Sequence, residues 1–178
     1  MEDWLLIIRC KRGDTKALGR IYEKYKPDCL LLAMSLVNDS SAAEDIWHDV
    51  FLRFAQGIDR FRLTGRLKGF FMTCVANQAK NYLKAQRRSI QPGSNGHPKE
   101  SGSEPLNGVI LNEQVSQLAA ALAVLPNEQR EVIMLHVHGR QSFASIANTL
   151  GMSRDTIKSR YRYGMQKLQT VFQQEVSS

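Results

Sequence analysis

A basic segment in the last third of the sequence carries side chains that could read nucleic acid. The stretch LGMSRDTIKSRYRYGMQKL, residues 150–168, combines hydroxyl and cationic side chains after a glycine. On a helical wheel, apolar residues occupy one face, and the other holds Asp155, Lys158, Ser159, Arg162, Tyr163 and Gln166. Such groups pair with phosphates and base edges, so the pattern predicts contact with DNA. The pattern alone leaves an ordinary solvated helix surface open as the alternative.

The residues just before this segment predict how the fold would present it. Ile146, Ala147 and Leu150 mark a short helix that Gly151 ends, and Ser153 is placed to cap the next helix. A helix, a short glycine-containing turn and a second helix form a helix-turn-helix motif. The N-terminal turns of the second helix enter the major groove in such motifs. We therefore expect a DNA-reading helix that starts after Ser153.

Position on that helix separates two kinds of contact. Residues on the outward face of the first turns are expected to meet base edges, and those at the helix start, on its flank or in the preceding turn to meet phosphates. The expected base contacts are Lys158, Ser159 and Arg162, with Tyr163 at the margin, and the expected phosphate contacts are Arg140, Arg154 and Arg160.

A second group of candidate residues surrounds the loop GIDRFRLTG, residues 57–65. Phe61 lies between Arg60 and Arg62, and Arg66 follows shortly after. An aromatic ring among cations suits stacking on an unpaired base with the strand backbone held by the cations. The helix predicted from about residue 66 to residue 88 extends this basic track for a separated strand through Lys80, Lys84, Arg87 and Arg88.

Helical periodicity throughout predicts an all-α protein, with two small helical domains joined by a flexible linker and the helix-turn-helix in the C-terminal one. The linker is residues 89–112, SIQPGSNGHPKESGSEPLNGVILN, which is rich in Pro, Gly, Ser and Asn and has no aromatic residue. Such a stretch buries too little surface to offset its chain entropy. The predicted domains are therefore residues 1–88 and 113–178.

The apolar stripes predict the cores and one cap. Ser41 and Glu44 match a capping box at the start of a helix. Trp47 flanks the inward face of that helix and is predicted either in the core or at an interface. The expected core residues include Ala43, Ile46, Val50, Phe54, Leu67, Phe70, Phe71, Cys74 and Val75 in the first domain, and Val115, Leu118, Leu122, Val132, Ile133 and Val137 in the second.

Composition narrows the class of function. The 178 residues contain 24 Lys and Arg against 17 Asp and Glu, a net charge of +7 that favours a polyanionic partner. Three widely spaced cysteines suit neither a disulfide framework nor a zinc site, and His136 and His138 lack further ligands. No catalytic motif is present, so we expect no enzyme activity and no cofactor. The absence of a signal peptide or a span long enough for a bilayer predicts a cytoplasmic protein.

Three stretches of the sequence carry motifs of one family. In the segment from residue 121 to residue 168 these motifs are Leu125-Pro126, Arg130-Glu131-Val132, Ile146-Ala147, Leu150-Gly151 and Thr156-Ile157-Lys158-Ser159-Arg160. The segment resembles the C-terminal promoter-recognising domain of the bacterial sigma factors of the extracytoplasmic-function (ECF) group. Upstream, SSAAEDIWHDVFLRF resembles the polymerase-binding helix and RFRLTGRLKGFFMTCVANQAKNYLKAQRR the promoter-melting segment. The chain departs from the family at His48-Asp49, where Gln-Glu is usual, at Phe70, where Trp is usual, and in its Arg162-Tyr163-Gly164-Met165 run.

The resemblance implies a partner for each surface. Core RNA polymerase would bind the outer face formed by Asp45, His48, Asp49, Leu52 and Gln56. Promoter DNA would meet the recognition helix at the minus-thirty-five element and the loop and basic track at the minus-ten element, where Asn77 would line a pocket for one flipped base. The linker would run through channels of the polymerase. The family also allows for an anti-sigma factor.

Two other functions fit parts of the pattern. The first is a stand-alone helix-turn-helix regulator that binds duplex DNA as a dimer, and the second is a protein-interaction adaptor whose basic face is incidental. A simple regulator does not need the acidic outer face of the helix at residues 41–56 or the aromatic and basic loop that follows it, and no dimerisation helix is evident. These features favour the sigma factor.

Overall fold

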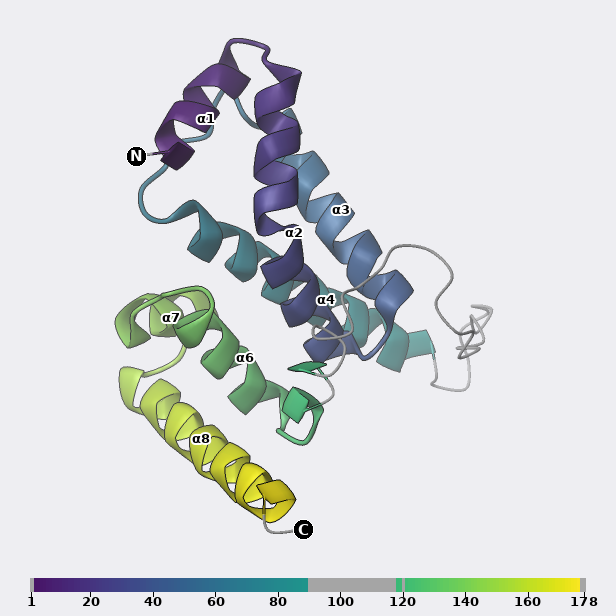
Figure 1. The fold of residues 1–178 in the computed structure, drawn as a ribbon, viewed down its shortest axis with the longest axis vertical. Helices are drawn as coiled ribbons and strands as arrows, with labels where there is room; N and C mark the ends of the chain where they lie inside the picture. Colours follow the sequence, from purple (N-terminus) through teal and green to yellow (C-terminus); the bar gives the residue numbers. More distant parts are fainter. Residues whose placement is uncertain (1, 90–117, 120, 177–178) are drawn as a thin grey trace.

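The computed structural model describes residues 2–89, 118–119 and 121–176, and that part of the chain contains helices and no strand. Most of the predicted linker, 89–112, and Val115 lie outside the described residues. The all-α prediction is confirmed. The helices form two bundles (Figure 1). Their bounds are α1 (Glu2–Lys11), α2 (Thr15–Val37), α3 (Ser40–Gln56), α4 (Leu67–Ser89), α6 (Asn127–Val137), α7 (Phe143–Leu150) and α8 (Arg154–Val176).

The first bundle is built around α2, which packs against α1, α3 and α4. Trp47 of α3 is fully buried and meets Phe71 of α4 edge-on, with 5.3 Å between ring centroids. Tyr22 of α2 lies 5.4 Å from the same indole. Of the two positions predicted for Trp47, the core or an interface, the structure shows the core. Burial of such a ring fixes the outward face of α3.

The start of α3 corrects one prediction. The cap is Asp39, whose carboxylate accepts a hydrogen bond of 3.0 Å from the amide of Ala42, and the helix begins at Ser40. The prediction of a capping box formed by Ser41 and Glu44 is therefore wrong. Asn38 ends α2 in the left-handed conformation, with φ at 55°, which turns the chain so that Asp39 is already extended and able to cap.

The second bundle brings together α6, α7 and α8. Gly151 has φ at 64°, and the Ser153 hydroxyl accepts a hydrogen bond of 3.1 Å from the amide of Thr156. Both predicted helix boundaries are confirmed. Gly164 lets α8 approach α6 closely, because a Cβ there would lie 2.6 Å from the Cδ1 atom of Ile133. Val137 was expected in the core but is half exposed, since it lies past the buried run of α6 at the end of the helix.

Arg130 and Glu131, which are adjacent on α6, both make structural contacts, one within the second bundle and one to the first. Arg130 is buried and donates to the carbonyl oxygens of Ala123 and Leu125, which fixes the segment before α6. Glu131 is buried as well, and its carboxylate lies 2.8 Å from the ammonium of Lys80 on α4. Burial raises the pKa of Glu131, and the Lys80 charge acts in the opposite direction. One residue of the pair thus organises its own bundle, and the other reaches across to the first.

The two bundles pack against each other through α6, which contacts α2 and α4 (Figure 1). Asp28 of α2 lies 3.4 Å from His138 Nδ1 and 2.8 Å from the ammonium of Lys68. The side-chain amide of Gln141 donates to the carbonyl oxygen of Gly69 and to the hydroxyl of Thr73, both at 3.0 Å. We call this packing the closed arrangement.

Candidate nucleic-acid interface

Helix α8 exposes most of the cations that were predicted to contact DNA. Ile157 and Gly164 are buried toward the rest of the bundle. Arg154, Lys158, Arg162 and Tyr163 are exposed, whereas Ser159 and Arg160 are partly buried. The structure therefore brings the predicted base-contacting cations onto one open face and places Arg160 at its inner edge.

Two exposed side chains on that face support each other. The guanidinium of Arg162 lies over the ring of Tyr163, 5.1 Å from its centroid. The contact orders a long side chain that would otherwise lose rotamer entropy on binding. Lys158 lies 3.9 Å from Asp155, an exposed pair worth little in water. Both cations remain available to an anionic partner.

Arg140 lies apart from α8, in the turn between α6 and α7. Its backbone φ is 50°, a left-handed conformation that residues other than glycine rarely adopt. The exposed side chain lines a cleft against the first bundle. The structure therefore does not place it on the same open face as Lys158 and Arg162.

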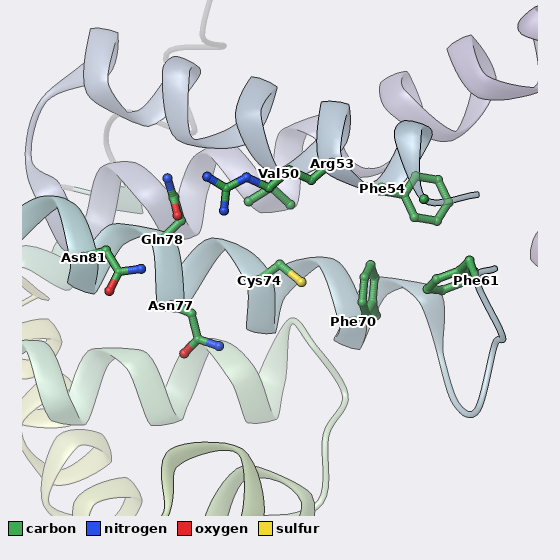
Figure 2. Close-up of a pocket in the computed structure, with 10 residues that line it drawn as sticks. Val50, Arg53, Phe54, Phe61, Phe70, Cys74, Asn77, Gln78 and Asn81 are labelled. Carbon is green, nitrogen blue, oxygen red and sulfur yellow. The ribbon is translucent and has the colours of Figure 1, made fainter. Parts of the chain in front are cut away.

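The predicted aromatic site is a pocket between α3, the loop after it and α4. It has a volume of 340 Å³ (Figure 2). Phe61 and Phe70 meet edge-on, 4.9 Å apart, and Phe54 lies 5.0 Å from Phe61. Phe70 was expected in the core, but it lines this pocket and is 36% exposed, because its neighbour Phe71 takes the inward position on α4 and adjacent residues of a helix do not share a face. The pocket is thus apolar at one end.

The other end of the pocket is polar. Figure 2 shows Gln78 of α4 near Arg53 of α3, with Asn77 and Asn81 projecting from the same helix. Sequence reasoning named Asn77 and missed the other three. Spacing could have found Gln78 and Asn81, because residues 74, 77, 78 and 81 follow Phe70 at intervals that keep them near one face of a helix. Arg53 lies on α3, so spacing along α4 carries no signal for it.

The basic track along α4 is divided. Lys84, Arg87 and Arg88 are exposed. Lys80 is also exposed, but the buried carboxylate of Glu131 holds its ammonium. The three loop arginines Arg60, Arg62 and Arg66 are exposed and line the cleft that also contains Arg140.

The acidic outer face of α3 is present as predicted. Asp45, His48, Asp49, Leu52 and Gln56 are all exposed. Leu52, 47% exposed, supplies an apolar centre within this polar surface. The inward neighbours Trp47 and Val50 hold the helix so that these side chains face away from the bundle.

The two histidines have partners other than a metal. His136 stacks on Phe143 with 4.2 Å between ring centroids and donates a hydrogen bond of 2.7 Å from Nδ1 to the carbonyl oxygen of Gln141. His138 faces Asp28 across the two bundles. Among the residues described, none of the helices is long and apolar enough to cross a membrane.

The fold and its surfaces define a two-bundle helical protein with a helix-turn-helix in its second bundle. Family comparisons match residues 21–89 to Sigma-70 region 2 and residues 121–170 to Sigma-70 region 4. The chain belongs to the sigma-70 family and is a sigma factor of the ECF type. It is a transcription initiation factor of RNA polymerase.

Individual relatives agree over most of the chain. The ECF RNA polymerase sigma factor EcfG of Rhodopseudomonas palustris is 28% identical over 142 residues, 80% of this chain and 77% of the relative. The ECF RNA polymerase sigma-E factor of Escherichia coli is 27% identical over 172 residues, 90% of this chain and 88% of the relative.

Two solved structures share the fold. CnrH in complex with the cytosolic domain of CnrY has a TM-score of 0.66 at 17% identity, covering 97% of this chain and 98% of that one. The sigma factor RpoE in complex with the anti-sigma factor NepR from Bartonella quintana has a TM-score of 0.66 at 24% identity, covering 89% and 98%.

Proposed function

We propose that this sigma factor opens promoters without catalytic chemistry of its own, by trapping one unpaired base of the minus-ten element in the pocket between α3 and α4. The observation that carries the proposal is the composition of that pocket. Phe61 and Phe70 supply aromatic surface, and Asn77 supplies amide donors and acceptors for a base edge. Unpairing a base costs a few kcal/mol, which such contacts can offset.

The cations around the pocket would hold the strand to which the flipped base belongs. Arg60, Arg62 and Arg66 line the adjoining cleft, which shares Phe61 and Phe70 with the pocket, and Lys84, Arg87 and Arg88 continue along α4. Lys80 can join this track only after its ammonium leaves Glu131. Binding of the minus-ten strand would therefore separate α4 from α6.

The second bundle would hold the minus-thirty-five element. Lys158, Ser159 and Arg162 are assigned to base edges, with Tyr163 beside them, and Arg140, Arg154 and Arg160 to phosphates. The exposure of Lys158 and Arg162 on one face supports this assignment. The proposed functional units are residues 1–88 and 113–178, with residues 89–112 as the connection.

Two protein partners complete the proposal, which assumes that the chain acts in the cytoplasm. Core RNA polymerase would dock on Leu52 and the acidic residues around it on α3, because exposed apolar centres within polar rims are typical of protein interfaces. One of the two solved structures with this fold is a sigma factor in complex with an anti-sigma factor, which supports an anti-sigma factor as a second partner.

Strand opening tests the pocket directly. Permanganate reactivity of unpaired thymines would be measured on a promoter with core polymerase and either the parent protein or the Phe61→Ala and Asn77→Ala variants. We expect both variants to retain duplex binding and to lose most of the minus-ten reactivity. Arg20→Ala, an exposed change on α2, is the control and should match the parent. Parental reactivity in both pocket variants would place base capture elsewhere.

A further inference from the structure

The closed arrangement creates a cleft that neither bundle forms alone. The first bundle contributes residues 60–66 and the start of α4, and the second contributes residues 139–142 and α7. Figure 1 shows α7 beneath the N-terminal end of α4. The cleft has a volume of 700 Å³, within the range of small-ligand sites.

Four arginines from the two bundles line this cleft. They are Arg60, Arg62 and Arg66 from the loop and Arg140 from the turn before α7. No aspartate or glutamate lines it, and within the described part of the chain none of the four guanidinium groups forms an ion pair. The remaining lining includes hydroxyl and amide donors from Thr64, Thr73, Gln141, Ser142 and Ser145. The cleft is therefore strongly cationic.

The contacts that hold the bundles together lie at other points of the interface. The ion pair of Glu131 with Lys80 and the contact of Asp28 with His138 lie outside the cleft, and Gln141 ties the turn to α4 at the edge of the cleft. Those contacts bring like charges toward one another in the cleft, which opposes closure. An anion between the arginines would convert that repulsion into attraction.

Guanidinium groups favour one class of anion. Their planar forks pair with two oxygens of a phosphate at once, and they are weakly hydrated. Four such groups around one cleft match a ligand with several phosphates better than a single carboxylate. We propose that the cleft binds a small polyphosphate anion, which bridges the two bundles and stabilises the closed arrangement of the free protein.

Such a ligand would act against promoter binding. By their names, the minus-thirty-five and minus-ten elements are centred about 25 base pairs apart, which is roughly 85 Å at 3.4 Å per pair. Arg140 and the loop arginines cannot bind those two distant elements and, at the same time, bind one small anion together. A ligand that binds only the closed arrangement shifts the population toward it. This inference concerns the free protein and does not require the base pocket proposed above.

Calorimetric titration of the full chain with inorganic tripolyphosphate at physiological ionic strength tests the site. We expect one site, weakened about tenfold or more by Arg66→Ala and by Arg140→Ala, because each removes charge-assisted hydrogen bonds. Arg20→Ala, an exposed change on α2, should leave the affinity unchanged. Circular dichroism would check that helix content is unaltered in each variant.

A second variant tests whether closure is required. Asp28→Asn removes a charge from the contacts between bundles and none from the cleft, and it should weaken binding several-fold. A parallel titration with ATP separates two sources of the phosphates. Equal affinity assigns recognition to the phosphates alone, and higher affinity adds contact of the base with Phe61 or Phe70, which also line the cleft. Both results support a polyphosphate site.

Three results would overturn the proposal. The first is no measurable binding of tripolyphosphate. The second is the same small loss of affinity for Arg20→Ala as for Arg66→Ala and Arg140→Ala, which is the behaviour of a general basic surface. The third is unchanged affinity in Asp28→Asn, which would show that the bundles need not be closed.

Discussion

The two surfaces proposed to contact DNA differ in how many elements build them. The recognition face belongs to α8 alone, and its cations are exposed because Ile157 and Gly164 fix the opposite side against the bundle. The base pocket needs α3, the following loop and α4 together. A face on one helix survives small shifts of its neighbours, whereas a pocket shared by three elements depends on the core that holds them.

The largest expected effect comes from a change in the core that supports the base pocket. Trp47→Ala removes the fully buried indole that packs against Tyr22 and Phe71. We expect a loss of about 3 to 5 kcal/mol in the free energy of unfolding of the first bundle. Urea denaturation followed by circular dichroism measures it. A loss below about 1 kcal/mol would mean that the aromatic cluster does not hold the pocket in place.

The corresponding change in the second bundle is smaller. Gly164→Ala places a methyl group 2.6 Å from Ile133 Cδ1 and 3.2 Å from Gln129 Cβ, so α8 or the Ile133 side chain must move. We expect a destabilisation of about 1 to 3 kcal/mol in urea denaturation. The same change at Gly19, where nothing lies within 4 Å, is the control and should stabilise or leave stability unchanged. Equal changes in stability at both positions would show that the packing of α8 on α6 does not require a glycine at position 164.

Two arginines on α8 sharpen the distinction between base and phosphate contacts. Arg162→Ala should cost about 1 to 3 kcal/mol on the preferred promoter and relax discrimination at one base pair. Arg160→Ala, on the inner edge, should weaken all sequences alike and reduce the salt slope by about one. Competition binding of polymerase with each variant at several salt concentrations measures both. Equal small losses on every sequence would indicate a solvated helix surface.

The smallest expected effect is the pH dependence of the contact that Asp28 makes between the two bundles. Burial alone would raise the pKa of Asp28, but hydrogen bonds from His138 and Lys68 hold it below its usual 3.8. Its contribution to the closed arrangement is therefore present above the unfolded pKa and lost as the pH falls through the folded value. Energy transfer between dyes on the two bundles should fall below about pH 4. Asp28→Asn should remove part of this dependence, and an unchanged acid transition would contradict the assignment.

Sequence reasoning succeeded where one helix carries the information. The turn at Gly151, the cap at Ser153 and the exposed cations of α8 all follow from spacing along one segment. The exposure of Phe70 was missed because periodicity does not decide whether Phe70 or its neighbour Phe71 faces the core, and the buried residue is Phe71. The cap at Asp39 was missed because it depends on the left-handed turn at Asn38. The contact of Glu131 with Lys80 joins residues far apart in the sequence, and periodicity carries no signal for it.

Reconstituted transcription tests the central claim most directly. Core RNA polymerase, purified protein and promoter DNA from the same organism would be combined, and transcripts would be mapped at their 5′ ends. We expect promoter-specific transcripts only when this protein is present, and we expect their loss when Asp45→Arg and Leu52→Ala remove the acidic and apolar contacts on α3. A protein that binds promoter DNA by itself and yields no promoter-specific transcript with core polymerase would contradict the account and favour a stand-alone regulator.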